Sequence, residues 1–157
     1  MSTALEKADS MMVGALKTQT ILFVGIVPSD SVCLDRILLE SHWQSHGVGT
    51  CRQALDFLDQ HRVSVVVSEP ELSDGCWREL LNGMASLRAP PNLIVSSRLA
   101  DARLWAEVLN LGGFDVLLTP FETEEVLRVT RAARHNWGSK QPAGPARPAS
   151  AGSAESQ

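Results

Sequence analysis

The stretch VVVSEPELSDG, from Val65 to Gly75, passes from three β-branched apolar residues into a segment rich in acids. Consecutive valines favour a strand, and a strand without polar alternation is typical of a parallel sheet that is covered on both faces. The acids begin at Glu69, where this strand should end. The stretch therefore predicts a buried central strand that carries a carboxylate at its C-terminal end.

Four other short runs with strand character accompany this one, and helix-like segments separate the five. The runs comprise residues 20–26, 48–51, 63–69, 92–97 and 115–119. The run 48–51 is the weakest and suits an edge strand. Five alternating βα units predict an α/β fold with a doubly wound, five-stranded parallel sheet, a (βα)5 three-layer sandwich of the flavodoxin-like type.

Helix signals fill the intervals between these runs. Ser29 or Ser31 can cap the first helix, Asp101 the fourth and Thr123 the fifth. Gly112 and Gly113 should stop the fourth helix. The first three helices are recognised by the apolar positions Leu34, Ile37, Leu38 and Leu39, then Ala54, Leu55 and Leu58, then Trp77, Leu80 and Leu81.

Composition limits the class of protein. The chain has 157 residues and a formal net charge of −4. This charge does not favour nucleic acid or an anionic membrane as a partner. Its three cysteines lack C-x-x-C spacing, which indicates reduced thiols in a cytoplasmic protein rather than disulfides or a zinc site. We expect a flexible leader (1–18), one domain (19–137) and a disordered Gly/Ala/Pro/Ser tail (138–157).

Residues at the C-terminal ends of the predicted strands are the candidate site. In a doubly wound parallel sheet these ends meet at one edge, where the functional crevice lies. The residues brought together in this way are Gly25, Ile26, Glu69, Ser96, Ser97 and Thr119.

Four motifs at these strand ends resemble the receiver domain of bacterial two-component response regulators, over residues 18–137. ILFVGIVPSD (21–30) stands where receivers have a strand that ends in acids, and SEPELSDG (68–75) resembles the phosphoacceptor strand and its loop. PNLIVSS (91–97) resembles the strand with the Ser/Thr switch residue, and GGFDVLLTPF (112–121) resembles the strand that ends in Lys-Pro-Phe. The resemblance implies a receiver fold and a role in phosphorelay signal transduction.

The departures from the receiver pattern fall on the residues that perform phosphotransfer. By resemblance, Gly25 and Ile26 replace the metal-binding acids, Glu69 replaces the phosphoacceptor Asp, and Thr119 replaces the lysine. Ser96 keeps the switch hydroxyl. Phosphotransfer requires Mg²⁺ to neutralise charge, so we expect Mg²⁺ binding to be lost, no cofactor and no enzymatic activity. The resemblance thus implies a degenerate receiver, or pseudo-receiver.

Three interpretations of Glu69 remain open from the sequence. It can accept phosphate atypically, although its carboxylate sits further out and a displacement of about 1 Å can cost about 100-fold in rate. It can be a fixed anion that holds an active-like arrangement by hydrogen bonding to Ser96 or Thr119. It can also be a solvated carboxylate without a signalling role. Arg98 is either its counter-ion or an exposed loop arginine.

The segment LADARLWAEVLNLGG (99–113) predicts an interaction surface. Leu104, Val108 and Leu111 form the core stripe of a helix, whereas Trp105 and Leu109, with Ala102, form a second stripe that should be partly exposed. An exposed Trp is a candidate hot spot for a partner. The alternative is that Trp105 packs against the last helix and is buried.

By resemblance, receivers dimerise or dock partners on the face of the fourth helix, fifth strand and fifth helix. Val116 lies on that strand, where many receivers carry the aromatic half of the switch. We therefore expect a single-domain signalling protein that acts on a protein partner in trans or forms a homodimer. An atypical receiver that is still phosphorylated is the main alternative.

A small enzyme on the same type of sheet is a further alternative. Ser68 and Ser96 lie at the crevice edge, but the histidines His42, His46, His61 and His135 fall elsewhere, so a catalytic triad is disfavoured. Glu69, Glu71 and Asp74 are a weak candidate metal site, because Asp74 with Gly75 suits a turn. No glycine-rich phosphate loop supports nucleotide binding.

Overall fold

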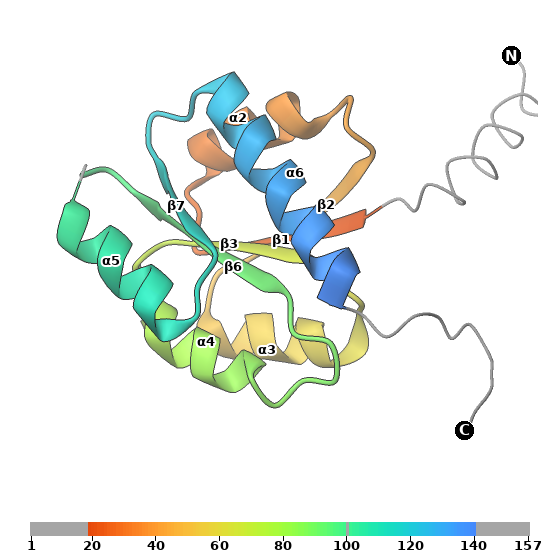
Figure 1. The fold of residues 1–157 in the computed structure, drawn as a ribbon, viewed down its shortest axis with the longest axis vertical. Helices are drawn as coiled ribbons and strands as arrows, with labels where there is room; N and C mark the ends of the chain where they lie inside the picture. The colour runs from red at the N-terminus through yellow and green to blue at the C-terminus, as the bar shows by residue number, and fades with distance from the viewer. Residues whose placement is uncertain (1–18, 100, 141–157) are drawn as a thin grey trace, which may run out of the picture.

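The computed structural model describes residues 19–99 and 101–140, and these residues form a three-layer α/β sandwich (Figure 1). A five-stranded sheet with the order β2-β1-β3-β6-β7 is the middle layer, and every neighbouring pair in it is parallel. The fold class and the doubly wound sheet predicted from the sequence are confirmed.

The strands and helices have these bounds. The strands of the main sheet are β1 (Gln19–Val24), β2 (Trp43–Val48), β3 (Val65–Ser68), β6 (Asn92–Ser97) and β7 (Asp115–Leu118). The helices are α2 (Pro28–Leu38), α3 (Cys51–Gln60), α4 (Trp77–Met84), α5 (Ala102–Leu111) and α6 (Thr123–Lys140). A separate antiparallel pair, β4 (Glu71–Leu72) and β5 (Gly75–Cys76), lies between β3 and α4.

The central strands are continuously apolar because alternate side chains enter two different cores. On β1, Leu22 and Val24 point into the core beneath α3, α4 and α5, whereas Ile21 and Phe23 point into the core beneath α2 and α6. The same alternation holds along β3 and β6. Burial of both faces stabilises the sheet by roughly 1.5–3 kcal/mol for each fully buried large aliphatic side chain.

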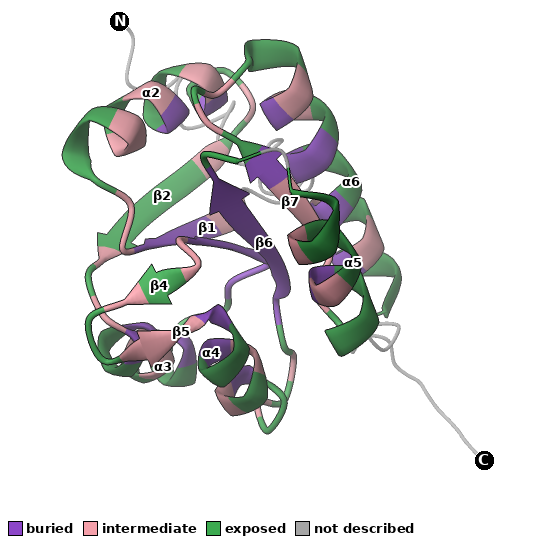
Figure 2. Ribbon diagram, turned by 90° about the vertical axis from the view of Figure 1, so that its left-hand side faces the viewer, coloured by how far each residue is buried: buried purple, intermediate pink, exposed green. Residues whose placement is uncertain are grey.

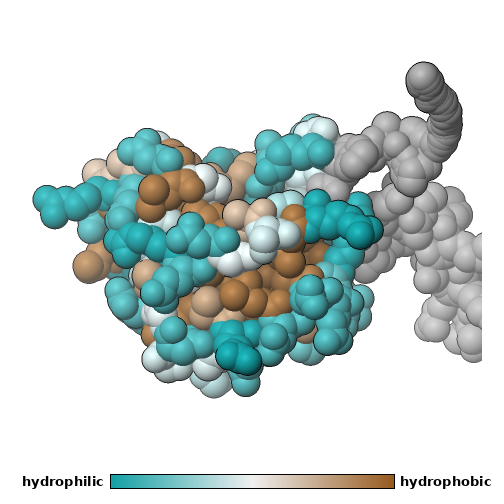
Figure 3. All heavy atoms as spheres, turned by 90° about the horizontal axis from the view of Figure 1, so that it is seen from below, coloured by the Kyte–Doolittle hydropathy of each residue, from teal (hydrophilic) through white to brown (hydrophobic). Residues whose placement is uncertain are grey.

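The five helices of the described residues divide between the two faces of the sheet. Figure 1 shows α2 and α6 on one side and α3, α4 and α5 on the other. On the face where α3 and α4 lie, apolar residues remain visible at the centre, with polar residues around them (Figure 3). Half-buried Leu55, Leu81 and Leu87 contact the core there. Across the described residues, the structure contains no helix of the length and apolarity that a membrane span requires.

The second strand was predicted at the wrong place. It runs from Trp43 to Val48 rather than over 48–51, because Thr50 caps α3 by accepting a hydrogen bond from the backbone N–H of Gln53 at 3.0 Å. Figure 2 shows β2 largely exposed, whereas β1 and β6 are buried. An exposed edge strand needs no apolar run, so the sequence pattern missed it.

The helix ends agree with the prediction in part. Asp101 caps α5 by accepting the N–H of Arg103 at 2.9 Å, and Gly112 ends that helix with φ of 107°. Neither Ser29 nor Ser31 caps α2, because the helix already begins at Pro28 after Val27. The helix α6 begins at Thr123 itself rather than after it.

Two other expectations need correction. α6 continues to Lys140, so residues 138–140 of the expected tail are helical. Leu111, predicted on the core stripe of α5, is 52% exposed, because the helix ends there at Gly112. The leader and the rest of the tail lie outside the described residues.

Candidate functional site

Glu69 and Ser96 form a direct hydrogen bond at the C-terminal edge of the sheet. The Ser96 hydroxyl donates to Oε2 of Glu69 at 2.9 Å. The backbone of Glu69 is fixed at the same place, because its N–H donates to the carbonyl of Val24 at 3.1 Å. Ser96 is buried and Glu69 is half-buried, so the bond runs from the core toward the surface at this edge of the sheet.

Thr119 lies at the same edge but does not bind Glu69. Its N–H and its hydroxyl both donate to the carbonyl oxygen of Ser97, at 2.8 Å and 3.3 Å. The end of β7 is thereby tied to the end of β6. Of the two hydrogen-bond partners that the sequence offered for Glu69, the structure brings Ser96 to it and directs Thr119 elsewhere.

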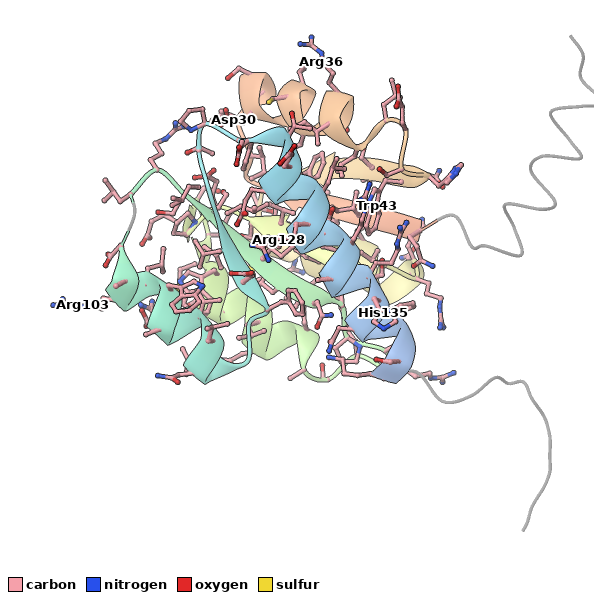
Figure 4. All side chains as sticks on the ribbon, turned by 45° about the horizontal axis from the view of Figure 1, so that its top comes forward. Asp30, Arg36, Trp43, Arg103, Arg128 and His135 are labelled. Atoms are coloured by element: carbon pink, nitrogen blue, oxygen red, sulfur yellow. The ribbon has the colours of Figure 1, made fainter. Side chains whose placement is uncertain are left out.

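Arg98 contacts an acid other than Glu69. Its Nη2 lies 3.6 Å from Oδ2 of Asp30, although 64% of the Arg98 side chain is exposed. Asp30 belongs to the first turn of α2 (Figure 4). That oxygen of Asp30 is buried, and among the described residues it accepts no hydrogen bond. Asp30 was not a predicted site residue. The contact links the loop after β6 to α2. Arg98 is therefore the counter-ion of Asp30 and not, as one interpretation of the sequence had it, of Glu69.

Gly25 and Ile26 follow β1 at the C-terminal edge of the sheet. Gly25 has φ of 71°, a left-handed conformation that favours glycine. A β-carbon built on Gly25 would lie 2.6 Å from Cδ2 of Leu72 and 3.7 Å from Cβ of Glu69. Ile26 packs against the core beneath α2 and α6. The space beside Gly25 is therefore filled by an apolar side chain.

A receiver-type Mg²⁺ does not fit this set of residues. Mg²⁺ requires oxygen ligands in near-octahedral geometry. Gly25, Ile26 and Leu72 offer no side-chain oxygen, so that Glu69 is the only acid among these four residues. No group of three or more His, Cys, Asp or Glu residues that could hold a metal exists within 19–99 and 101–140.

Asp74 has a structural role that the sequence suggested only in part. Its two carboxylate oxygens accept the backbone N–H groups of Cys51 at 2.8 Å and Arg52 at 3.0 Å, in the first turn of α3. These hydrogen bonds, that of Arg52 first, lower the pKa of Asp74 below its usual value. Because the carboxylate is engaged with a helix start, the weak metal site of Glu69, Glu71 and Asp74 is not formed.

Trp105 is on the surface, as its helical stripe predicted. It is 49% exposed, and its indole N–H donates to Oδ1 of Asp115 at 3.1 Å, so the ring is fixed across to β7. Leu109 on the same helix is 40% exposed, and Leu118 on β7 is 46% exposed. The exposure of Leu118 was not predicted, because the apolar run 115–119 indicated a strand that is buried on both faces. Val116, by contrast, is half-buried against the core beneath α5.

The histidines of the enzyme alternative lie away from Glu69. His46 on β2 and His61 after α3 stack on the two sides of Phe57, with ring centroids 4.3 Å and 4.0 Å apart. His61 also pairs through Nδ1 with the Phe57 carbonyl at 3.0 Å. The ring contacts involve neither Ser68 nor Ser96.

Comparison with known proteins finds similarity in structure but not in sequence. No protein-family model and no curated protein matches the chain. The signal receiver domain of an HD domain-containing protein from Pseudomonas fluorescens matches with a TM-score of 0.70 and 23% identity, over 79% of this chain and 92% of that one. The chain has the receiver fold.

Two other solved structures with the receiver fold are similar. The signal receiver domain of a LuxO repressor protein from Vibrio parahaemolyticus has a TM-score of 0.71 at 15% identity, covering 78% of this chain and 94% of that one. The beryllofluoride-activated NtrC4 receiver domain dimer has a TM-score of 0.69 at 19% identity, covering 75% and 98%. At such identities the likeness concerns the receiver fold alone.

Proposed function

We propose that this protein is a pseudo-receiver: a cytoplasmic two-component signalling protein that does not accept phosphate and acts by binding another protein or a second copy of itself. The observation that carries the proposal is the Glu69–Ser96 hydrogen bond. It joins the carboxylate at the phosphoacceptor-equivalent position directly to the hydroxyl at the switch-equivalent position.

The electrostatics of the crevice support the loss of phosphotransfer. A transferring phosphoryl group needs cations around its oxygens, and these stabilise the transition state more than any other single contribution. Thr119 supplies a hydroxyl that binds Ser97, and Arg98 is directed toward Asp30. Gly25 and Ile26 have no side-chain oxygen that could coordinate Mg²⁺. Glu69 is left as an anion whose partner is a neutral hydroxyl.

The proposed output surface is formed by α5, β7 and α6 and is defined by Trp105, Leu109 and Leu118. An exposed Trp held by a hydrogen bond needs little ordering when a partner binds, so its contribution to affinity is large. The structurally similar NtrC4 receiver domain is a dimer in its activated form. By analogy, the Glu69–Ser96 pair takes the place of activation and keeps the loop after β6 in one arrangement.

Intact-mass measurement tests the proposed loss of phosphotransfer. The full chain is incubated with Mg²⁺ and acetyl phosphate, alongside a phosphorylation-competent receiver as a positive control. The mass of this protein should stay unchanged while the control gains one phosphoryl group. A gain of one phosphoryl group that maps to Glu69 would instead support the alternative, an atypical receiver in a phosphorelay.

A further inference from the structure

We infer that two copies of this chain join through the edge strand β2, antiparallel about a two-fold axis at Ser45, so that their two sheets become one continuous sheet. Strand β2 is the outermost strand of the main sheet, and β1 is its only strand neighbour among the described residues. The inference goes beyond the proposed function, whose output surface is formed by α5, β7 and α6. Pairing through β2 leaves that surface free for another protein.

Every second residue of β2 directs its backbone groups away from the sheet. The carbonyl of His42 accepts the N–H of Gln19 at 3.3 Å, and the same bond recurs six residues further along both strands at 2.9 Å. In a parallel ladder, alternate residues of a strand bond to the same neighbour, so the even-numbered residues of β2 bond to β1. The N–H and C=O groups of Trp43, Ser45 and Gly47 therefore face outward, where a further strand can bind them.

The strand itself carries no protection against pairing with another strand. Proteins commonly block exposed edges with charged side chains, proline or β-bulges. Residues 43–48, WQSHGV, contain no Asp, Glu, Lys, Arg or Pro, and they pair with β1 in unbroken register. Figure 2 shows that most of this strand is exposed. Its outward backbone groups are thus open to an extended partner.

The order of side chains along β2 favours a second copy as that partner. In an antiparallel pair about Ser45, Trp43 of each copy lies opposite Gly47 of the other, on the side of the sheet that α2 covers. A β-carbon built on Gly47 has no atom within 4 Å, so the glycine leaves room for the larger ring. Aromatic residues opposite glycines at sheet edges help to fix the register of strands.

The same register brings no like charges together. On the other face of the strand, the exposed Gln44 of one copy lies across from the exposed His46 of the other. An amide then faces an imidazole, whereas like charges directly opposite would destabilise the pair. A shift by two residues in either direction would leave one of the three outward residues of each β2 without a residue of β2 opposite it. The register about Ser45 uses all three.

Charge reversal at residues 44 and 46 tests this register in the full chain. An acidic variant carries Gln44→Glu and His46→Glu, and a basic variant carries Gln44→Lys and His46→Lys. In sedimentation velocity the natural chain should dimerise, and each variant alone should raise the dimer Kd at least tenfold, because like charges then face each other. An equimolar mixture of the two variants should restore the dimer. Gln60→Glu and Gln60→Lys, at an exposed glutamine of α3, are the matched controls and should leave the Kd unchanged.

Gly47→Pro is a second, independent test. It removes an outward N–H, and because Gly47 does not have a positive φ and has open space for a β-carbon, the fold should persist. This variant should also raise the dimer Kd at least tenfold.

Three outcomes would overturn the inference. The natural chain could stay monomeric, which would leave the edge to an extended segment of another protein. The dimer could survive in the β2 variants, or fail to return when the acidic and basic variants are mixed. It could also be lost in Trp105→Ala but not in the β2 variants, which would assign self-association to the proposed output surface. None of these results decides the proposed loss of phosphotransfer, which the phosphodonor experiment on the natural chain tests.

Discussion

At the scale of single residues, the polar side chains at the C-terminal edge of the sheet are paired with other residues of the protein. The Ser96 hydroxyl binds Glu69, both donors of Thr119 bind Ser97, and Arg98 contacts Asp30. Each of these pairs joins the end of one strand to a neighbouring segment. Under the proposed function, the groups at the switch-equivalent and lysine-equivalent positions, Ser96 and Thr119, bind other residues of the protein.

The Glu69–Ser96 pair should contribute measurably to stability. A hydrogen bond to a charged group contributes about 1.5–3 kcal/mol, and partial exposure of Glu69 reduces this toward about 1 kcal/mol. A double-mutant cycle with Glu69→Ala and Ser96→Ala, followed by urea denaturation, should give a coupling free energy of about 1 kcal/mol. Glu69→Gln, which keeps an acceptor oxygen, should lose less than Glu69→Ala. A coupling near zero would favour the solvated-carboxylate interpretation.

Asp74 should make stability depend on pH. Its pKa is lowered in the folded state, chiefly by the N–H groups of Arg52 and Cys51, so its contribution is fully present above the ordinary value of 3.8 and is lost as the pH falls through the lowered one. Asp74→Asn should therefore lower the urea midpoint at pH 7, and this deficit should shrink at pH 3. Asp56→Asn, an exposed substitution on α3, serves as the control. A deficit that is independent of pH would contradict the assignment.

At the scale of elements, α6 is fastened to the sheet by a buried polar residue. Asn92, at the start of β6, donates through Nδ2 to the Ala133 carbonyl at 2.8 Å and to Oδ1 of Asn136 at 3.0 Å. It accepts from Lys140 Nζ at 3.1 Å. The Arg134 guanidinium lies over the Trp43 ring at 5.0 Å, joining α6 to β2. The last turns of α6 therefore depend on specific contacts as well as on apolar burial.

Asn92→Ala should loosen this end of the helix. Loss of a buried hydrogen-bonding residue costs about 1–3 kcal/mol, because its former partners are left buried. Urea denaturation should show that loss, and hydrogen exchange should accelerate at residues 133–140 more than at residues 123–130. Asn110→Ala, an exposed asparagine on α5, should change neither. Uniform acceleration along α6 would argue against a local anchor.

The elements that the sequence predicted are those whose pattern is set by burial. β1, β3 and β6 were found because both of their faces are covered, which requires apolar runs. β7 was found from the same kind of run, although its last residue, Leu118, is exposed. β2 was missed because its central residues are exposed and its place is set by backbone pairing with β1. The contacts of Leu72 with Gly25 and of Arg98 with Asp30 depend on loop shape. Residue spacing alone does not determine such shapes.

At the scale of the whole molecule, the two faces of the sheet differ in what they expose. Beside α5 and β7, Trp105, Leu109 and Leu118 present apolar surface, with the Trp105 indole held by Asp115. On the opposite side, α2 exposes Val32, and Leu39 directly after it is also exposed. The proposed binding function assigns the partner to the first of these surfaces, since Trp105 is an exposed aromatic ring that the hydrogen bond to Asp115 holds in place.

Trp105→Ala should reduce capture of a partner, or self-association, at least tenfold while leaving the fold unchanged. Sedimentation velocity over a range of concentrations measures self-association, and affinity capture from the native cytosol measures partner binding. Leu39→Ala is the matched control, because it also removes an exposed apolar side chain but lies directly after α2, on the other side of the sheet. Equal losses in both variants, or none in either, would contradict the assignment of this surface.

The anchoring of Lys140 to Asn92 also decides how the molecule can be handled. Asn92 begins β6 and Gln19 begins β1, so Gln19 and Lys140, the first and last of the described residues, lie at the margin where strands start. Glu69 lies at the opposite margin. Fluorophores or affinity handles joined before Gln19 or after Lys140 consequently attach on the reverse side from Glu69. The protein can be immobilised or labelled there while the edge of the sheet that carries Glu69 faces away from the attachment.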